Sequence, residues 1–275
     1  MAGRGPMHVY ISVDMEGVAG VATCDQAYRG GSGYPSAQEL MTGEANAAIA
    51  GAFDGGATAV TINDSHGTMD NLLLEKVDPR VEIVLGTPKA QCMMHGLAPE
   101  HDVALFVGYH AAAGEFGVLS HSFSMCFSRF RVNGVTATEA DVNALMAAGL
   151  GVPIGLVTGD DATCRDAVGK HPGVRTVQVK RAEGFLAATS LHPSVARDRI
   201  RAAAAETVAG VADLVVAPVP EALTLEVQVK QFHHLEQILK IPGFTALDAL
   251  TAQVTVGDPS TLFDMVALCY QLDPE

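Results

Sequence analysis

The sequence has few cysteines, few basic residues and no long apolar run, and each of these scarcities excludes a class of protein. Its five cysteines are odd in number and irregularly spaced, without a Cys-x-x-Cys pair, which argues against a disulfide framework and a cysteine-based zinc site. Lys and Arg total 17 against 31 Asp and Glu, and the resulting net charge of −14 repels the phosphate backbone of nucleic acids. No uninterrupted apolar run reaches the roughly 18 residues that cross a bilayer, so we expect no membrane protein.

The start of the chain shows no targeting segment. Met1–Pro6 is short and polar, and no apolar stretch of the signal-peptide type follows it. We therefore treat residues 1–6 as an N-terminal extension and expect a cytoplasmic protein. The 275 residues, 48% of them apolar, are enough to bury a core without covalent cross-links. An acidic surface favours cations as ligands, among them metal ions and substrates that carry an amine.

Apolar runs that read as buried strands alternate with helical patterns over the first 160 or so residues. Ser36 with Glu39 three residues later fits a capping box, and Thr136 or Thr138 is placed to cap a later helix. This alternation predicts an α/β fold, here a three-layer domain around a mainly parallel sheet. The expected strands are 9–13, 57–62, 81–85, 103–107, 122–132 and 153–158, and the expected helices are 36–53 and 137–150.

The pattern loosens after about Pro172. The rest of the chain contains a strand-like stretch at 223–229 and expected helices at 193–210, 231–240 and 259–272. We predict an α/β domain over residues 7–172, which carries the candidate site, and a smaller C-terminal α+β subdomain over residues 173–275.

Polar residues follow three of the expected strands at their carboxyl ends. Asp14 and Glu16 follow the first strand, His66 follows the second, and His110 follows the strand at 103–107. Side chains two residues apart in extended chain point to the same side, so Asp14 and Glu16 can face one ion. Because ligands of open α/β sheets bind beyond the carboxyl ends of the strands, these four residues can converge.

Glu139, near the start of the helix at 137–150, adds a third carboxylate. Two histidines and three carboxylates suit one or two zinc ions, manganese or another divalent metal. A two-metal site needs a bridging ligand, and Asp14 at the end of a buried strand is the natural one. Each residue taken singly also fits a structural role: the histidines as hydrogen-bonded loop residues, Asp14 as a turn or cap, and Glu139 as a solvated helix start.

His121 lies in the segment LSHSFS, after a stretch whose Gly114 and Gly117 allow a loop to close over a substrate. An imidazole exchanges protons near neutral pH, so we assign His121 an acid–base role. The pair His233–His234 is expected to lie on a helix face or in an interface.

Five separated segments resemble, in type and order, the zinc D-aminopeptidase family encoded with dipeptide-permease genes. These segments are YISVDMEGVAG, VTINDSHGTMDNLL, LFVGYHA, GVLSHSF and TEADVNA. The resemblance implies a catalytic histidine at His121 and a ring-shaped homodecamer with active sites that face an internal chamber. It also implies five metal ligands, namely Asp14, Glu16, His66, His110 and Glu139.

We therefore expect a metallo-aminopeptidase that hydrolyses short peptides with an N-terminal D-amino acid, such as D-Ala-D-Ala, at a site with two zinc ions per subunit. Asp14 would bridge the ions, and His121 would stabilise the tetrahedral intermediate or protonate the leaving amine. Two alternatives stay open: a metal-dependent hydrolase of another amide or ester bond, and a non-enzymatic protein that binds metal or peptide. No nucleic acid or membrane partner is expected.

Overall fold

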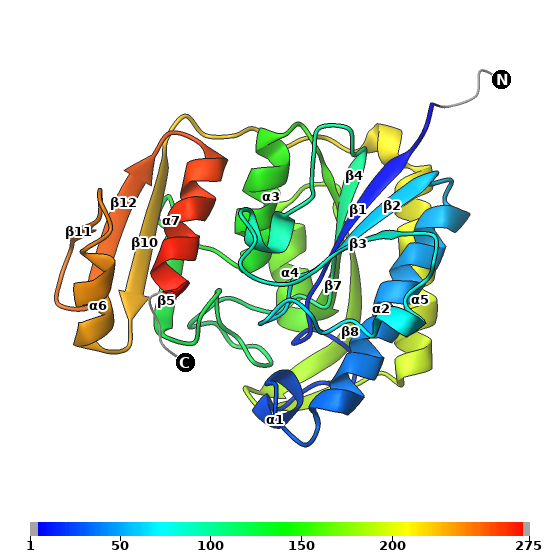
Figure 1. Ribbon diagram of the computed structural model, residues 1–275, viewed down its shortest axis with the longest axis horizontal. Helices are drawn as coiled ribbons and strands as arrows, with labels where there is room; N and C mark the ends of the chain where they lie inside the picture. Colours follow the sequence, from blue (N-terminus) through cyan, green and yellow to red (C-terminus); the bar gives the residue numbers. More distant parts are fainter. Residues whose placement is uncertain (1–4, 272–275) are drawn as a thin grey trace.

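The computed structural model describes residues 5–271 and contains two β-sheets that lie side by side (Figure 1). Residues 1–4 of the expected N-terminal extension lie outside the described residues, as does Leu272 at the end of the expected last helix. Among the described residues, no helix combines the length and the apolarity that crossing a bilayer requires.

The larger sheet has seven strands, and all neighbouring pairs except the last are parallel. The strands are β1 (His8–Val13), β2 (Ala59–Asp64), β3 (Glu82–Val84), β4 (Val103–Val107), β7 (Ile154–Asp160), β8 (Arg175–Gly184) and β9 (Ala187–Ser190). They are ordered β3-β2-β1-β4-β7-β8-β9, with β8 and β9 forming an antiparallel hairpin. The carboxyl ends of β2, β1 and β4 therefore lie next to one another.

Helices cover both faces of this sheet, which explains why β1, β4 and β7 are buried at nearly every position. The helices α2 (Tyr34–Asp54) and α5 (Pro193–Ala209) pack together on one face. The helices α3 (Glu139–Gly149) and α4 (Asp161–Lys170) lie on the other (Figure 1). This arrangement confirms the predicted three-layer α/β domain.

Alternate side chains of β1 enter two different cores, because successive residues of a strand point to opposite faces. Val9, Ile11 and Val13 pack in the core under α2 and α5. Tyr10 packs in the core under α3, which continues into the second sheet. The register of β1 therefore fixes both cores and, one residue beyond Val13, the direction of Asp14.

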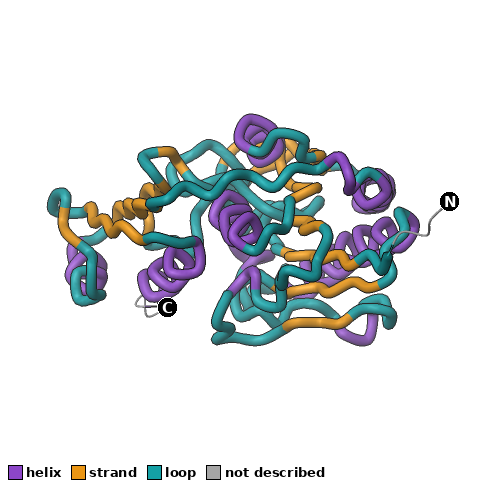
Figure 2. Tube along the Cα trace, turned by 90° about the horizontal axis from the view of Figure 1, so that it is seen from above, coloured by secondary structure: helices purple, strands orange, loops and turns teal. Residues whose placement is uncertain are grey.

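The second sheet is antiparallel, in the order β11-β12-β10-β5-β6. Its helix α7 also contacts α3 and so joins the two sheets, and Figure 2 shows this part at one end of the molecule. The elements are β5 (Phe127–Val132), β6 (Val135–Thr136), β10 (Leu223–Val229), α6 (Phe232–Ile238), β11 (Thr245–Ala246), β12 (Thr251–Val256) and α7 (Pro259–Gln271). The short helix α1 (Cys24–Ala27) and three 3-10 turns, at Leu74–Lys76, Cys92–Met94 and Val211–Asp213, complete the fold.

Each of the two sheets contains strands from both sides of residue 172, the predicted subdomain boundary. β5 and β6 precede it but belong to the second sheet, whereas β8, β9 and α5 follow it and belong to the larger fold. The two sheets are therefore interleaved along the chain. The division into a domain of residues 7–172 and a subdomain of residues 173–275 stays a prediction.

Most predicted bounds differ from the observed ones by at most two residues, and two of the differences have an evident cause in the structure. The helix expected from Ser36 begins at Tyr34, with Gly33 as its N-cap and a proline in its first turn. The strand expected from Ser122 begins only at Phe127, because the chain turns at Phe123, whose φ is 59°.

Candidate metal centre

The ends of three adjacent parallel strands bring four of the predicted residues together. Asp14 and Glu16 follow β1, His66 follows β2, and His110 follows β4. The turn after β1 is held against β4, because Asp14 N donates to Val107 O at 2.8 Å and Gly17 N donates to Gly108 O at 2.7 Å.

Helix α3 supplies the fifth residue, Glu139, at its first position. Thr138 is the N-cap and forms a capping box with Asp141, as the sequence allowed. Phe123 N donates to Glu139 Oε1 at 2.6 Å and orients the carboxylate. The helix N-terminus also favours a negative charge at this position.

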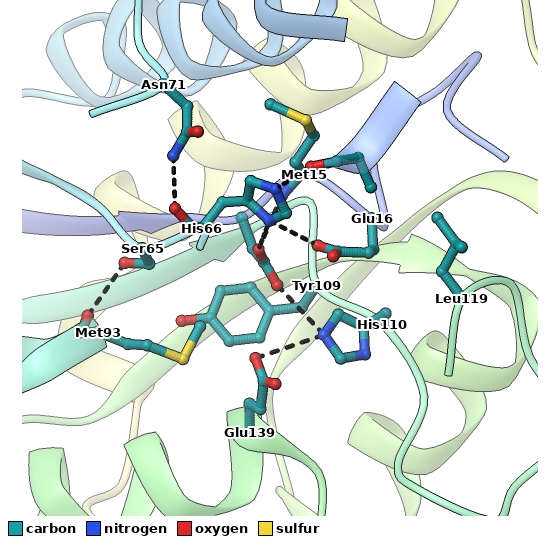
Figure 3. Close-up of polar contacts among 12 residues, drawn as sticks. Met15, Glu16, Ser65, His66, Asn71, Met93, Tyr109, His110, Leu119 and Glu139 are labelled. Carbon is teal, nitrogen blue, oxygen red and sulfur yellow. Dashed lines mark hydrogen bonds and ion pairs between the residues drawn. The ribbon is translucent and has the colours of Figure 1, made fainter. Parts of the chain in front are cut away.

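Asp14 lies between two histidines and faces each with a different oxygen. Its Oδ1 is 3.2 Å from His66 Nδ1, and its Oδ2 is 3.4 Å from His110 Nε2. Glu16 Oε2 approaches His66 Nδ1 to 2.9 Å, and Glu139 Oε2 approaches His110 Nε2 to 3.4 Å (Figure 3). The five predicted ligands therefore converge, and none of them is more than 6% exposed.

Backbone carbonyls fix the orientation of all three histidines. His66 Nε2 lies 2.7 Å from Ala27 O, His110 Nδ1 lies 3.0 Å from Ala111 O, and His121 Nδ1 lies 2.8 Å from Leu119 O. A carbonyl only accepts, so each of these nitrogens carries the hydrogen. In a neutral ring, the lone pair of the other nitrogen then points at the carboxylates, as in protein metal sites.

Several buried atoms of the cluster lack a hydrogen bond of acceptable geometry despite the short approaches. Among the described residues these include Asp14 Oδ2, Glu16 Oε2 and His110 Nε2. Leaving such atoms unpaired is costly unless a ligand satisfies them. Within the described residues, potential donor atoms lie within 4.8 Å of one another in two groups, namely Asp14, Glu16 and His110, and His110, His121 and Glu139. Nitrogen and carboxylate donors in this arrangement fit zinc.

His121 stands at the open side of the cluster. Its ring stacks on His110 with 4.1 Å between centroids, and its Nε2 is 3.7 Å from Glu139 Oε1. Its side chain is 16% exposed, against 1% for His110. The structure thus brings all six predicted residues together, with His121 the most accessible to a substrate.

Burial and mutual charge shift the pKa values of the cluster strongly. Burial, reinforced by Glu16, raises the pKa of Asp14 to about 7. Burial disfavours the charge of His110, but Glu139 and Asp14 outweigh it and raise its pKa to about 10. Burial and the neighbouring His110 lower the pKa of His121. Such opposed shifts are typical of functional sites.

A cavity of about 630 Å³ opens over the cluster and contains residues that the sequence did not single out for function. Cys92 and Tyr270, whose Sγ and hydroxyl lie 3.0 Å apart, form part of its wall, and Arg29 lies in its lining. Tyr270 belongs to α7, so the C-terminal part of the chain reaches the site.

Lys180 is a further residue that the sequence did not indicate. It is 2% exposed, and its Nζ donates to the carbonyl oxygens of Glu16, Val18 (3.0 Å) and Val21 (2.6 Å). Burial lowers its pKa to about 8. Lys180 therefore holds the turn that carries Glu16 through hydrogen bonds to its backbone carbonyls.

Asp64 and the pair His233–His234 lie outside the cluster and have structural surroundings. Asp64 accepts hydrogen bonds from the backbone of Asn71 and Leu72. It orders the loop after His66. The pair His233–His234 lies on α6 beside the second sheet.

Comparisons with known proteins point to one family of enzymes. Residues 7–268 match the model of peptidase family M55, described as D-aminopeptidase. A D-aminopeptidase of Bacillus subtilis (strain 168) is 38% identical over 190 residues, which are 69% of this chain and 69% of that protein. The solved structure of DppA from Bacillus subtilis, described as a Zn-dependent D-aminopeptidase and a self-compartmentalizing protease, matches with a TM-score of 0.91 at 31% identity, over 97% of each chain.

Proposed function

The chain belongs to the D-aminopeptidase family and is a zinc-dependent D-aminopeptidase, and we propose that its buried cluster binds two zinc ions. The observation that carries this proposal is the orientation of Asp14, whose two oxygens approach two different histidines. A carboxylate in this position is suited to bridge two ions. Bound ions would also satisfy the buried atoms that lack hydrogen bonds within the protein.

The contacts around each histidine suggest how the ligands divide. Asp14 Oδ1, Glu16 and His66 would hold one ion. Asp14 Oδ2, His110 and Glu139 would hold the other. Each ion then has three protein ligands, the number typical of catalytic zinc sites, which leave a further position open.

His121 is proposed to move protons during hydrolysis. When bound, zinc supplies a Lewis acid that polarises the scissile carbonyl and lowers the pKa of a water molecule toward about 7. Leu119 O holds the hydrogen of His121 on Nδ1, so Nε2 is left to act in the cavity. Because its pKa is lowered, the ring is uncharged near neutral pH and accepts a proton from the attacking water. It then delivers this proton to the amine nitrogen that leaves.

We propose short peptides with an N-terminal D-amino acid, such as D-Ala-D-Ala, as the substrates. The family description and the names of both relatives support D-residue specificity. The cavity has the size of a small-ligand site, which suits a few residues better than a long chain. A cytoplasmic location stays a prediction from the sequence.

We propose that the chain forms a homo-oligomer, and specifically the ring of ten subunits that the family resemblance implies. The self-compartmentalizing DppA supports an assembly of this kind. Exposed apolar side chains support it independently: Phe116 is 67% and Leu186 is 51% exposed. The loops that carry them lie side by side, because Leu119 N donates to Phe185 O at 2.8 Å.

Zinc content and hydrolysis measured on two variants test the function. Asp14→Ala removes the proposed bridge, so bound zinc and hydrolysis of D-Ala-D-Ala should be lost together. His121→Ala should keep its zinc but lower kcat by about 10²- to 10⁴-fold, because only the proton transfer is removed. Elemental analysis and a ninhydrin assay of released D-alanine give the two readouts.

Asp198→Ala, at an exposed position of α5, controls for the loss of one carboxylate. Full zinc and activity in Asp14→Ala would refute the bridging role, and an unchanged rate in His121→Ala would refute the proton transfer. A parallel panel of L-peptides, p-nitrophenyl esters and phosphates separates a D-aminopeptidase from a hydrolase of other bonds.

A further inference from the structure

The cavity over the metal centre contains one strongly basic side chain. Among the described residues that line it, Arg29 is the only Lys or Arg, in a chain whose net charge is −14. Its guanidinium contacts Asp70 Oδ1 at 2.5 Å and Thr68 Oγ1 at 3.1 Å. It also lies 5.8 Å from the centre of the Tyr34 ring. The presence of a positively charged side chain in this cavity suggests that it binds a negatively charged group.

The backbone ties Arg29 to the immediate surroundings of a proposed zinc ligand. Ala27 O is the carbonyl that binds His66 Nε2, and Arg29 follows two residues later. Its partner Thr68 follows His66 by two residues as well. Two residues of chain span at most about 7 Å, so the Cα of Arg29 lies close to the residues around His66. A peptide of a few residues whose amino end lies at the proposed zinc site can therefore reach Arg29.

The guanidinium keeps hydrogen-bond donors available for a ligand. Both of its hydrogen bonds use Nη2, and within residues 5–271 no hydrogen-bond partner is found for Nε or Nη1. The N–H groups of Nη1 can therefore donate a charge-assisted hydrogen bond to a carboxylate oxygen. The side chain is 53% exposed, so a peptide that enters the cavity can reach it.

We propose that Arg29 binds the C-terminal carboxylate of the substrate and so restricts the enzyme to short peptides with a free C-terminus. This inference rests on the proposed function, because it assumes that the amino end of the peptide lies at the metal centre. The distance from the cleaved bond to Arg29 then sets the preferred length. An extended peptide adds about 3.5 Å per residue, which places the carboxylate of a di-, tri- or tetrapeptide in range.

The ratio of kcat/KM for a free-acid peptide to that for its C-terminal amide tests this proposal. The substrates are D-Ala-D-Ala, its tri- and tetra-alanine homologues with the same N-terminal D-residue, and the amide of each. Wild type should prefer the acid about tenfold or more at one of these lengths, because the amide loses a charge-assisted pair. In Arg29→Gln this ratio should fall to about one, with hydrolysis of the amides retained.

Asp70→Asn distinguishes substrate binding from a merely structural ion pair. Both Arg29→Gln and Asp70→Asn break the same pair, so a structural role predicts the same effect in both variants. A carboxylate-binding role predicts opposite effects, because loss of Asp70 frees the guanidinium and raises the acid-to-amide ratio. The pair is solvent-exposed, so both variants should fold.

Arg80→Gln is the matched control. Arg80 has the same side-chain exposure, 53%, and is paired with Asp78, but it does not line the cavity. Its acid-to-amide ratio should equal that of wild type. An unchanged ratio in Arg29→Gln at every length, or a fall in Asp70→Asn, would overturn the inference. A wild type that cleaves neither acids nor amides would refute the proposed function itself, and this inference with it.

Discussion

At the scale of single residues, Glu44 links the stability of the protein to pH. It is 2% exposed, its Oε1 accepts from Ala19 N at 2.9 Å, and its Oε2 has no hydrogen-bond partner among the described residues. Burial raises its pKa from 4.5 to about 7. Between these pH values the folded protein holds a proton that the unfolded chain releases. The contribution of Glu44 to stability is therefore full below pH 4.5 and is lost as the pH rises to 7.

Glu44→Gln should remove this dependence, because an amide does not titrate. The free energy of unfolding of wild type minus that of the variant should fall by up to about 3 kcal/mol between pH 4.5 and 7.5. Urea unfolding at a series of pH values measures it, and taking the difference cancels the effect of pH on zinc binding. Glu236→Gln, on the exposed side of α6, controls for the loss of one carboxylate. A constant difference across this range would show that Glu44 is charged in the folded protein.

The residues of the proposed metal centre could be singled out in the sequence because each stands at a recognisable place. The residues that support the proposed centre could not. Asp14, His66 and His110 follow their strands within three residues, where a polar side chain is conspicuous in the sequence. Lys180 lies within a half-exposed strand, where a lysine ordinarily faces solvent. Its burial depends on the turn after β1, which is distant in sequence, so no local pattern indicates it.

At the scale of elements, the turns after β1 and β4 touch without room for a side chain. A Cβ placed on Gly17 would lie 1.9 Å from Tyr109 O and 2.6 Å from Gly108 O. This contact sets Glu16, on one turn, against His110, on the other. Backbone contact therefore fixes the spacing of these two proposed ligands.

Gly17→Ala should push these turns apart, destabilise the protein by about 3 kcal/mol or more and lower its zinc content. Gly169→Ala, in the last turn of α4 with open space around it, should instead be neutral or stabilising by up to about 1 kcal/mol. Thermal unfolding and elemental analysis give both readouts. Equal stability of the two variants would show that the turns can separate without cost.

The elements that the sequence predicted are those with a strong apolar pattern. The strands β1, β2, β4 and β7 are buried on both faces or nearly so, and their apolar runs are evident. The strands β8, β9 and β12 were missed, because they are rich in polar or small residues and only partly buried. Such strands are recognised by their partners, which a sequence alone does not reveal.

At the scale of the whole molecule, the interleaving of the two sheets was not predictable. The segment that forms β5 and β6 lies between β4 and α3 in the chain but pairs with β10, some 90 residues later. Pairing over such a separation depends on the complete fold rather than on any local signal. The fold class, by contrast, follows from the alternation of strands and helices and was predicted correctly.

The proposed assembly predicts the mass of the native particle. Analytical ultracentrifugation should give a particle mass about ten times the 28.6 kDa of the single chain. Phe116→Ser combined with Leu186→Ser should lower this mass, because the two side chains lie in the proposed contact between subunits. A wild type that sediments as a single chain at micromolar concentration would exclude the ring.

Lys180 also has a consequence for how the protein is made. When Glu139 has left the ribosome, all six residues of the proposed metal centre have been made, but Lys180, whose ammonium group holds the carbonyls of Glu16, Val18 and Val21, has not. Chains begin to fold during translation from the N-terminus. Until β8 emerges and docks beside β7, these carbonyls lack the ammonium group of Lys180 as a donor. The nascent chain therefore completes the proposed zinc site only after translation has passed β8.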